Sequence, residues 1–511
     1  MKRLLLSVFA AAITAAWAVP STAADFTFGG EYRLRGEWRN NVDFRKTDTA
    51  GGSTAGNSNY NASDSADFWM QRVRLTTNVK ATDDTTVKIT LQDTRMWGAS
   101  QNAGGGPQLT DNGSTNTFSA ASQAASNNTT DLHESYLNVA KLFDTNLSVR
   151  LGRQELVYGD QRLIGSFGWS NNGRSFDAIK FTHATELVNV DLFTSKIAEN
   201  NRTATDQDFN GIYASSTKLL PGHTLDVYYL SLRDHAEGGT PFGWGAANTI
   251  VPSGSRLAST NIIGTPSKTQ VLNTYGVRVK GAGAGVDYTA ELPIQRGRIS
   301  TGNAACLGCT SQTHNYKIKA TAFALKAGYS IPAAAKLRLG FEYDYASGDK
   351  DGFSTTSTGG SAEVVGTFFN LFPTNHDKLG LMDQQAWRNV KAYNLNASIA
   401  PMDKLSLLAS YWKFNLASRY DGWYGAGTWN TNATGIRTAN TRTTVGRVST
   451  DVGKELDLIA TYKYNSSVTV ELGAARFFAG KFIKDKIETS AALDNTTKPQ
   501  DWAYLSVTSA F

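Results

Sequence analysis

The chain has 511 residues with a formal net charge of +6, 18% charged residues, 11% aromatic residues and 2 cysteines. Its mean hydropathy of −0.32 excludes a polytopic helical membrane protein, which needs runs of about 20 apolar residues. The aromatic content argues against disorder, two cysteines cannot support a disulfide-rich scaffold, and the small positive excess is not typical of a nucleic-acid-binding protein. A polar, aromatic-rich and glycine-rich chain of this kind indicates an all-β protein, and outer-membrane barrels share this composition.

The N-terminus has the pattern of a secretory signal peptide. Lys2 and Arg3 precede an apolar stretch over residues 4–17, and small residues follow it. This stretch is too short for a stable membrane span, so the pattern predicts a signal peptide over residues 1–24. Its removal takes away two cations and no acid, which lowers the formal charge from +6 to +4. The remainder, residues 25–511, is expected to form a single domain.

Short segments with alternating apolar and polar residues follow one another along this domain. Such segments predict β-strands, and an even number of them fits a single-chain bacterial barrel. About eighteen strands are predicted, over residues 25–39, 67–80, 85–97, 132–140, 146–156, 176–183, 186–196, 208–216, 224–234, 271–280, 285–298, 314–329, 335–345, 388–399, 404–416, 452–464, 467–479 and 502–511.

The connections between these strands alternate between short and long. Residues 81–84 and 184–185 are examples of short connections, and residues 98–131 and 346–387 are examples of long ones. Outer-membrane barrels have short periplasmic turns and long extracellular loops. The alternation therefore predicts a transmembrane antiparallel β-barrel in the bacterial outer membrane. Residues 364–372 are apolar, and we expect the long connection that contains them to fold into or over the barrel mouth as a constriction.

The end of the chain fits a barrel that is inserted into an outer membrane. The last predicted strand ends on Phe511, and Leu505 and Val507 lie on the same face. A C-terminal aromatic residue on an alternating strand is typical of the segment that the barrel-assembly machinery reads. The machinery and the outer-membrane lipids are therefore expected partners.

Alternation also predicts which side chains face the lumen. In the first strand, Phe26, Phe28 and Trp38 fall on one face and the charged residues on the other. Because Arg or Lys facing lipid at the midplane costs about 2–4 kcal/mol, the charged face must point into a water-filled lumen. The arginines that this rule turns inward are Arg33, Arg35, Arg72, Arg74, Arg278 and Arg338.

Two predicted strands mix charged and aliphatic residues on one face. These are residues 85–97, where Asp93 and Arg95 follow the aliphatic positions, and residues 146–156. Either a β-bulge, for example at Gly152, changes the face, or these strand ends lie beyond the membrane. Aromatic belts are general in membrane barrels, so an interfacial position is expected for the tryptophans near strand ends: Trp69, Trp97, Trp412 and Trp502.

The sequence offers no motif for catalysis or metal binding. HExxH, GxSxG and P-loop patterns are missing from it, and its six histidines show no metal-ligand spacing. No enzymatic activity, no cofactor and no metal site are predicted. Cys306 and Cys309 form a CxxC pair without the second pair or the adjacent histidine that zinc or haem would need. A small disulfide that closes an extracellular loop is the expected role of this pair.

Several stretches resemble one known family. Residues 152–165 (GRQELVYGDQRLIG) run into residues 169–178 (WSNNGRSFDA), and residues 371–376 (LFPTNH) and 453–457 (GKELD) follow later. These stretches closely resemble the alginate export family of bacterial outer-membrane porins, and the resemblance spans nearly all of residues 25–511.

The resemblance implies an eighteen-stranded monomeric barrel whose Arg-rich lumen passes an anionic polysaccharide such as alginate. It also implies roles for five residues in the runs quoted above. Arg153, Arg162 and Arg174 would belong to the basic set that lines the pore, and Asp160 and Asp177 would be the partners that shape it.

The sequence therefore predicts a porin or exporter for anionic solutes. Guanidinium groups bind carboxylates in a bidentate manner, and several weak sites in succession let a polyanion move without trapping it. One alternative is that the arginines only neutralise lumenal carboxylates. A separate alternative concerns the solute, which could be another uronic-acid polymer, a small organic anion or an aromatic acid. Further alternatives are a general diffusion porin, a barrel sheath for a partner protein and an outer-membrane enzyme. No nucleic-acid partner is expected.

Overall fold

The protein is represented by a computed structural model. It describes residues 24–41, 65–97, 129–198, 207–234, 269–301, 314–332, 334–350, 364–425, 449–488 and 497–511. The predicted signal peptide up to residue 23 and the Cys306–Cys309 pair lie outside these ranges. Among the residues so described, no helix has the length and apolarity needed to cross a membrane.

One β-sheet contains every strand of the described ranges. Its strands are β1 (Asp25–Asn40), β2 (Ser65–Lys80), β3 (Thr85–Met96), β4 (Thr129–Val139), β5 (Leu147–Gln154), β6 (Phe176–Ala184), β7 (Asn189–Ala198), β8 (Gln207–Ser216), β9 (His223–Asp234), β10 (Gln270–Gly283), β11 (Val286–Thr301), β12 (His314–Ser330), β13 (Arg338–Ala346), β14 (Val364–Val365), β15 (Val390–Met402), β16 (Leu405–Asn415), β17 (Asp451–Lys463), β18 (Val468–Ala479) and β19 (Gln500–Ala510). The described ranges also contain two 3-10 turns, η1 (Leu142–Asp144) and η2 (Ala334–Lys336), and the helix α2 (Lys481–Glu488).

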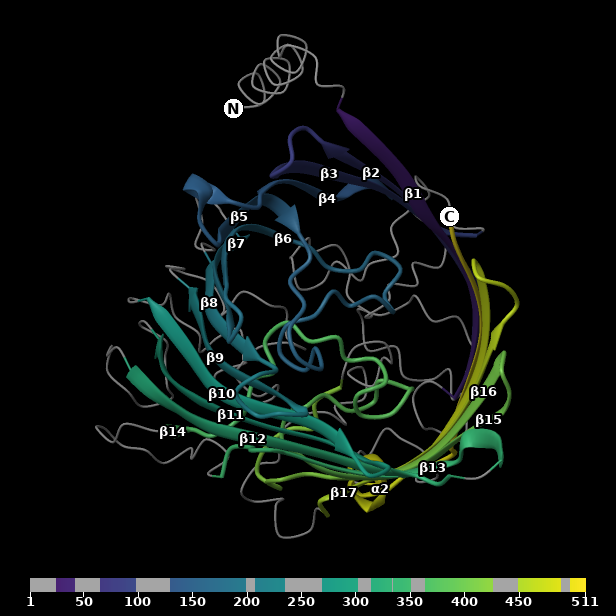
Figure 1. Cartoon of the computed structure of the whole chain (residues 1–511). Coiled ribbons are helices and arrows are strands. Elements are labelled where there is room, and N and C mark those ends of the chain that lie inside the picture. The colour runs from purple at the N-terminus through teal and green to yellow at the C-terminus, as the bar shows by residue number, and fades with distance from the viewer. Residues whose placement is uncertain are drawn as a thin grey trace.

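The sheet closes on itself to form a barrel (Figure 1). Neighbouring wall strands pair antiparallel, and β1 closes the ring by pairing with β19 from Glu31↔Ala510 to Asn40↔Asp501. β14 is a two-residue strand that pairs in parallel with β12, and β13 pairs directly with β15. The eighteen other strands of the described chain therefore form the wall, and closure leaves no strand edge without hydrogen-bond partners.

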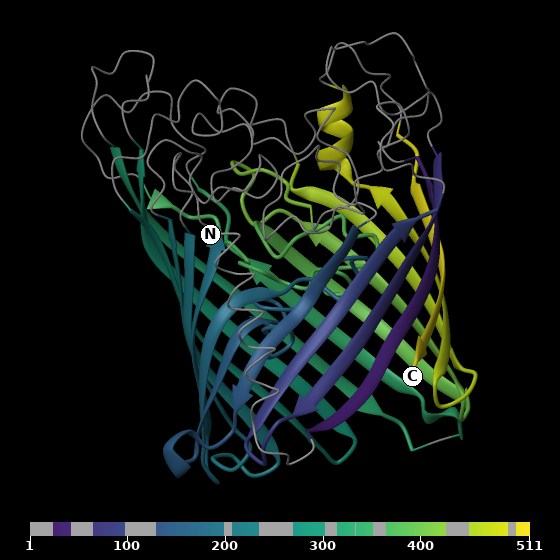
Figure 2. The same cartoon turned by 90° about the horizontal axis from the view of Figure 1, so that it is seen from above.

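The strands are tilted, and the short turns gather at one end of the barrel (Figure 2). We call this end the turn end and the opposite end the loop end. Each of the eighteen predicted strands has an observed counterpart, so the predicted transmembrane barrel is confirmed. Strand 335–345 begins later than expected because residues 334–336 form η2. The sequence did not predict β14 or α2, which are too short to show a clear period.

The predicted faces of the first two strands are confirmed. Phe26 and Phe28 are 57% and 76% exposed on the outside, whereas Arg35 and Glu37 are buried on the inside. β3 and β5, the two strands with charged and aliphatic residues on one face, keep their alternation up to the loop end. Gly152 pairs with Tyr136 without a register shift, so no bulge at Gly152 changes the face. The charged ends of these strands therefore remain on the outer face of the wall.

The tryptophans near strand ends divide into two groups. Trp69 lies on the outer face, where its ring centroid is 6.1 Å from that of Trp97 and 5.9 Å from that of Trp38. This agrees with an interfacial belt. Trp412 and Trp502, however, point inward and are each 4% exposed. The expected interfacial position is wrong for these two, because each lies on the inner face of its strand.

This division can be tested by fluorescence in bilayers that contain brominated lipid. Trp69→Phe is expected to remove a large part of the emission that bromine quenches, since Trp69 lies on the outer face. Trp502→Phe should leave the quenchable part unchanged, because its ring is enclosed by the barrel. An equal loss in both variants would contradict the two orientations.

Candidate functional site

Two irregular segments fold into the interior of the barrel (Figure 1). The first inner segment, residues 155–175, connects β5 to β6, and the second inner segment, residues 366–389, precedes β15. Irregular backbone is tolerated at membrane depth only where protein or water satisfies its polar groups. Tight bends allow these segments to turn inside the wall, for example at Gly159 (φ 54°) and Gly380 (φ 86°).

Backbone hydrogen bonds join the two inner segments. The amide of Gly165 donates to the Phe372 carbonyl (2.9 Å), the amide of Phe372 donates to the Leu163 carbonyl (2.8 Å), and the amide of Thr374 donates to Gln161 (2.9 Å). Leu163 and Phe372 are also buried together with much of the second segment. The predicted inward position of the long connection 346–387 is confirmed for residues 364–387; residues 351–363 lie outside the described ranges.

Arg174 strengthens this junction. Its Nη1 donates to the carbonyls of Gly165 (3.1 Å), Phe372 (2.6 Å) and Pro373 (2.8 Å). The side chain is 6% exposed, and burial lowers the pKa of Arg174 to about 10. Carbonyl dipoles thus hold this guanidinium, which links the two inner segments.

Two wall arginines bind the same two carbonyls of the first inner segment. Arg33 on β1 lies opposite Arg72 on β2. Arg33 donates to the carbonyls of Gly168 (2.7 Å) and Ser170 (3.0 Å), and Arg72 donates to the same two at 3.1 and 3.0 Å. Arg72 also binds the Glu31 carboxylate at 2.6 Å. The pair anchors the first inner segment to one side of the wall.

Trp169 extends this anchor to the second inner segment. Arg35 donates to the Trp169 carbonyl at 2.5 Å, and its Cζ lies 3.7 Å from the centroid of the indole ring. The His376 ring stacks on the same indole at 3.8 Å, and its Nδ1 lies 3.1 Å from Oδ2 of Asp383. One aromatic side chain therefore connects the wall, the first inner segment and the second inner segment.

The opposite side of the barrel holds the first inner segment through carboxylates. Arg162 pairs with Glu342 and with Asp344, the latter at 2.9 Å. Arg278 on β10 pairs with Asp160 at 2.5 Å and with Asp226 at 2.7 Å. Burial would raise the pKa of Asp160, but Arg278 together with Lys326 and Arg162 outweighs burial and lowers this pKa. These pairs fix the segment across the lumen.

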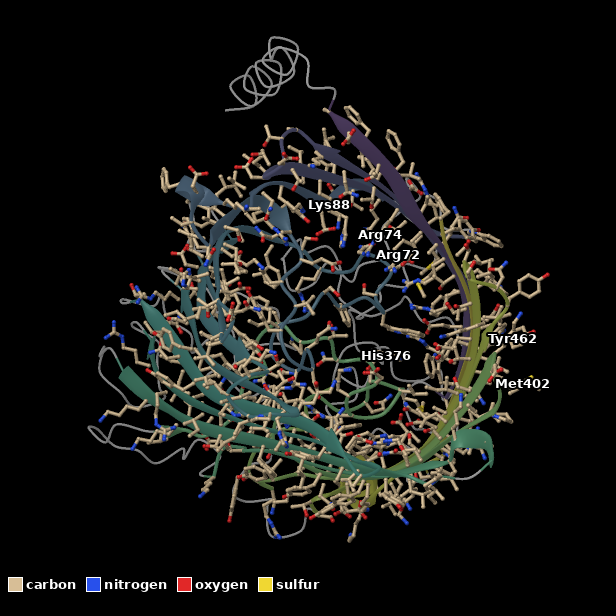
Figure 3. The ribbon with its side chains drawn as sticks, in the orientation of Figure 1. Arg72, Arg74, Lys88, His376, Met402 and Tyr462 are labelled. Carbon is tan, nitrogen blue, oxygen red and sulfur yellow. The ribbon has the colours of Figure 1, made fainter. Side chains whose placement is uncertain are left out.

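Two basic side chains near the Arg33–Arg72 pair keep contact with the lumen. Arg74 donates to Gln92 at 2.7 Å and lies 3.7 Å from Glu155. Lys88 pairs with Glu134 and its side chain is 28% exposed. Figure 3 shows Arg72, Arg74 and Lys88 on the inner side of the wall. Sequence reasoning did not single out Lys88, although it alternates with aliphatic outward residues on its strand.

Most of the residues predicted to line the pore face the interior; Arg338 does so at a distance from the others, and Arg153 and Asp177 face outward. Arg338 faces inward at the turn end, where it binds Asp287 at 2.7 and 2.8 Å. Arg153 and Asp177 pair at 3.4 Å on the outer face, where the side chain of Asp177 is 62% exposed. Their expected inward position is corrected: Asp177 shares its face with Ile179, which is 43% exposed outside.

The balance of lumenal charge differs across the barrel. On the inner face of β1–β3 cations outnumber Glu31 and Glu37, and on β9–β13 together with β17 carboxylates outnumber Arg278 and Lys326. The basic group consists of Arg33, Arg35, Arg72, Arg74 and Lys88, and the acidic group includes Asp226, Glu291, Glu342, Asp344 and Glu455. Within the described ranges, no set of three or more His, Cys, Asp or Glu side chains is arranged to hold a metal ion.

Arg174→Met is expected to lower the free energy of unfolding by about 3 kcal/mol, because three buried carbonyls lose a charged donor. Urea titration of the barrel refolded in vesicles measures this change. Arg476→Met is the control, since Arg476 pairs with Asp501 on the exposed outer face and such pairs contribute at most about 1 kcal/mol. Equal losses in the two variants would contradict the role of Arg174.

Replacing residues 366–385 with a short Gly/Ser linker is expected to raise the single-channel conductance, because these residues occupy the interior. Planar-bilayer recording measures the conductance, and heat-modified migration on a gel checks that the shortened barrel has folded. A folded variant with the conductance of the unmodified protein would contradict the constriction.

Comparison with known proteins gives a family match and a fold match. The sequence matches the family described as "Alginate export" over residues 25–495, and no curated protein sequence matches significantly. Acinetobacter baumannii OccAB2 has a TM-score of 0.52 at 8% identity, with 95% of this chain and 98% of that chain covered. Pseudomonas aeruginosa OccK9 (OpdG) has a TM-score of 0.49 at 14% identity over 95% and 99%.

The family match and the likeness to OccAB2 agree with the closed barrel. The structural likeness to OccAB2 concerns the fold alone, at 8% identity. The family match covers most of the chain and includes both inner segments. The chain belongs to the alginate export family of outer-membrane β-barrel porins.

Proposed function

We propose that this porin conducts anionic solutes and that a polyuronate such as alginate passes along its basic wall. One observation carries the proposal: on the inner face of β1–β3, four arginines and Lys88 outnumber Glu31 and Glu37, while carboxylates outnumber cations on β9–β13 and β17. A polyanion in such a transverse field is attracted to one wall and repelled from the other. Guanidinium groups also match the bidentate geometry of uronate carboxylates.

The basic residues divide into two roles under this proposal. Arg33, Arg35 and Arg174 bind carbonyls of the inner segments and set the shape of the constriction. Arg74 faces Glu155, whose side chain is 29% exposed, and the side chain of Lys88 is itself 28% exposed although its partner Glu134 is nearly buried. A passing carboxylate can replace Glu155 or Glu134 at these two cations. Conduction requires such sites to bind weakly enough for release.

A diffusion channel for small organic anions is the second candidate. It is favoured by the position of the two inner segments, which occupy the interior and leave less room for a polymer. The same basic wall would attract either kind of solute. Oligomers of increasing length distinguish the two candidates, because only a polymer channel is blocked by long chains that enter and thread through it.

The proposal predicts anion selectivity in a planar bilayer under a KCl gradient. Arg74→Gln combined with Lys88→Gln should reduce the anion-to-cation permeability ratio several-fold, because both charges lie beside the path. Arg476→Gln on the outer wall is the matched control and should leave the ratio unchanged. Uronate oligomers should block the unmodified channel more strongly than neutral oligosaccharides of equal length. Cation selectivity of the unmodified protein would overturn the proposal.

A further inference from the structure

A group of four basic residues lies on the outer face of the wall, outside the lumen. Residues of β11 and β12 that alternate with buried inward residues point outward near the loop end. Gln295 and Ile318 are almost fully buried on the inner face, and their neighbours on the outer face are exposed. We call the exposed set the outer basic patch; it consists of Arg296, Arg298, Lys317 and Lys319.

The register places like charges directly opposite each other. Arg296 pairs with Lys319, and Arg298 pairs with Lys317 across the two strands. Like charges in direct cross-strand pairs destabilise a sheet. Two such pairs in succession therefore oppose the folding of this part of the wall unless an anion binds them.

The described part of the protein supplies no such anion. Arg296 donates to the Gln295 carbonyl at 2.7 Å and Arg298 donates to the Thr269 carbonyl at 3.3 Å. Both partners are neutral. No carboxylate in the described ranges lies within ion-pair distance of any patch residue. The positive charge of the patch therefore remains without a compensating charge from these ranges.

Five other outward-facing cations near strand ends have acidic partners, whereas Arg233, Lys391 and Lys454 have no ion pair within the described ranges. The five pairs are Arg95–Asp93, Arg153–Asp177, Lys196–Asp208, Lys413–Asp451 and Arg476–Asp501. The lack of a carboxylate is therefore not particular to the patch. The patch differs from the other outward cations because its four residues face one another in two successive like-charge pairs, which indicates a bound ligand.

The depth of the patch follows from the same register. Tyr275 lies opposite both Tyr229 and Ile294, and the two tyrosine rings pack on the outer face at 5.1 Å. Tyrosines in such positions mark the membrane–water interface. Arg296 is the next outward residue beyond Ile294, in the direction of the loop end. The patch therefore begins at the level where lipid headgroups replace acyl chains.

We propose that the outer basic patch binds the phosphorylated headgroup of a glycolipid in the leaflet at the loop end. Phosphate groups carry the charge and the acceptor oxygens that Arg and Lys require, and Arg can bind them in a bidentate manner. Headgroup phosphates would lie between Arg296 and Lys319 and between Arg298 and Lys317. They would relieve the repulsion within both pairs and hold the lipid against β11 and β12.

Native mass spectrometry of the detergent-solubilised barrel tests this proposal, with bisphosphorylated lipid A as the probe. The variant replaces all four patch residues with Gln. The control replaces Lys141, Lys218, Lys404 and Lys463 with Gln, which removes the same charge at the turn end. The unmodified protein and the control are expected to retain lipid A, and the patch variant is expected to bind it at least tenfold more weakly.

Further measurements decide the outcome. Lipid A without its phosphates should bind the unmodified protein as weakly as it binds the patch variant, and high salt should weaken binding of the phosphorylated form. Heat-modified migration confirms that each variant is folded. Unchanged lipid A retention by the folded patch variant would overturn the proposal. Competition by uronate oligomers at the patch, with no dependence on lipid phosphate, would also overturn it.

Discussion

Backbone carbonyl groups inside the barrel need hydrogen-bond donors, and arginine side chains supply them. The first inner segment presents the carbonyls of Gly168 and Ser170 to the wall, where Arg33 and Arg72 bind both. Arg174 binds carbonyls of both inner segments. A buried carbonyl without a partner costs about 1–3 kcal/mol, so the inner segments can occupy the interior only because these guanidinium groups are there.

The same arrangement produces the electrostatics of the lumen. Burying cations requires compensation, and the wall compensates differently on its two sides. Near β1 and β2, carbonyls share the guanidinium groups with carboxylates: Arg33 donates to carbonyls, whereas Arg35 also pairs with Glu37 at 2.9 Å and Arg72 with Glu31 at 2.6 Å. Carboxylates bind Arg162 and Arg278 on the other side. The contacts that hold the inner segments therefore also set the balance of charge around them, which links the shape of the lumen to the proposed anion path.

Sequence reasoning predicted the wall well because strand period, turn position and lumenal charge all indicate the same arrangement. The resemblance placed Arg153 and Asp177 in the lumen wrongly, because charged residues at a strand end can face outward beyond the lipid, where they pair with each other. Sequence reasoning also misplaced Trp502, although a signal was present: Trp502 has the opposite parity to the outward residues Leu505 and Val507. The anchor between Arg33 and Gly168 spans 135 residues, and no local pattern indicates such a contact.

Hydrogen exchange of the amides of Gly165 and Phe372 tests the arrangement of the interior most directly. Both amides donate across the junction of the inner segments, in a region that Arg174 encloses. If arginines hold these segments inside the barrel, both amides should exchange as slowly as amides of the wall strands in the lipid-embedded protein. Exchange within seconds, at the rate of an open loop, would contradict the account.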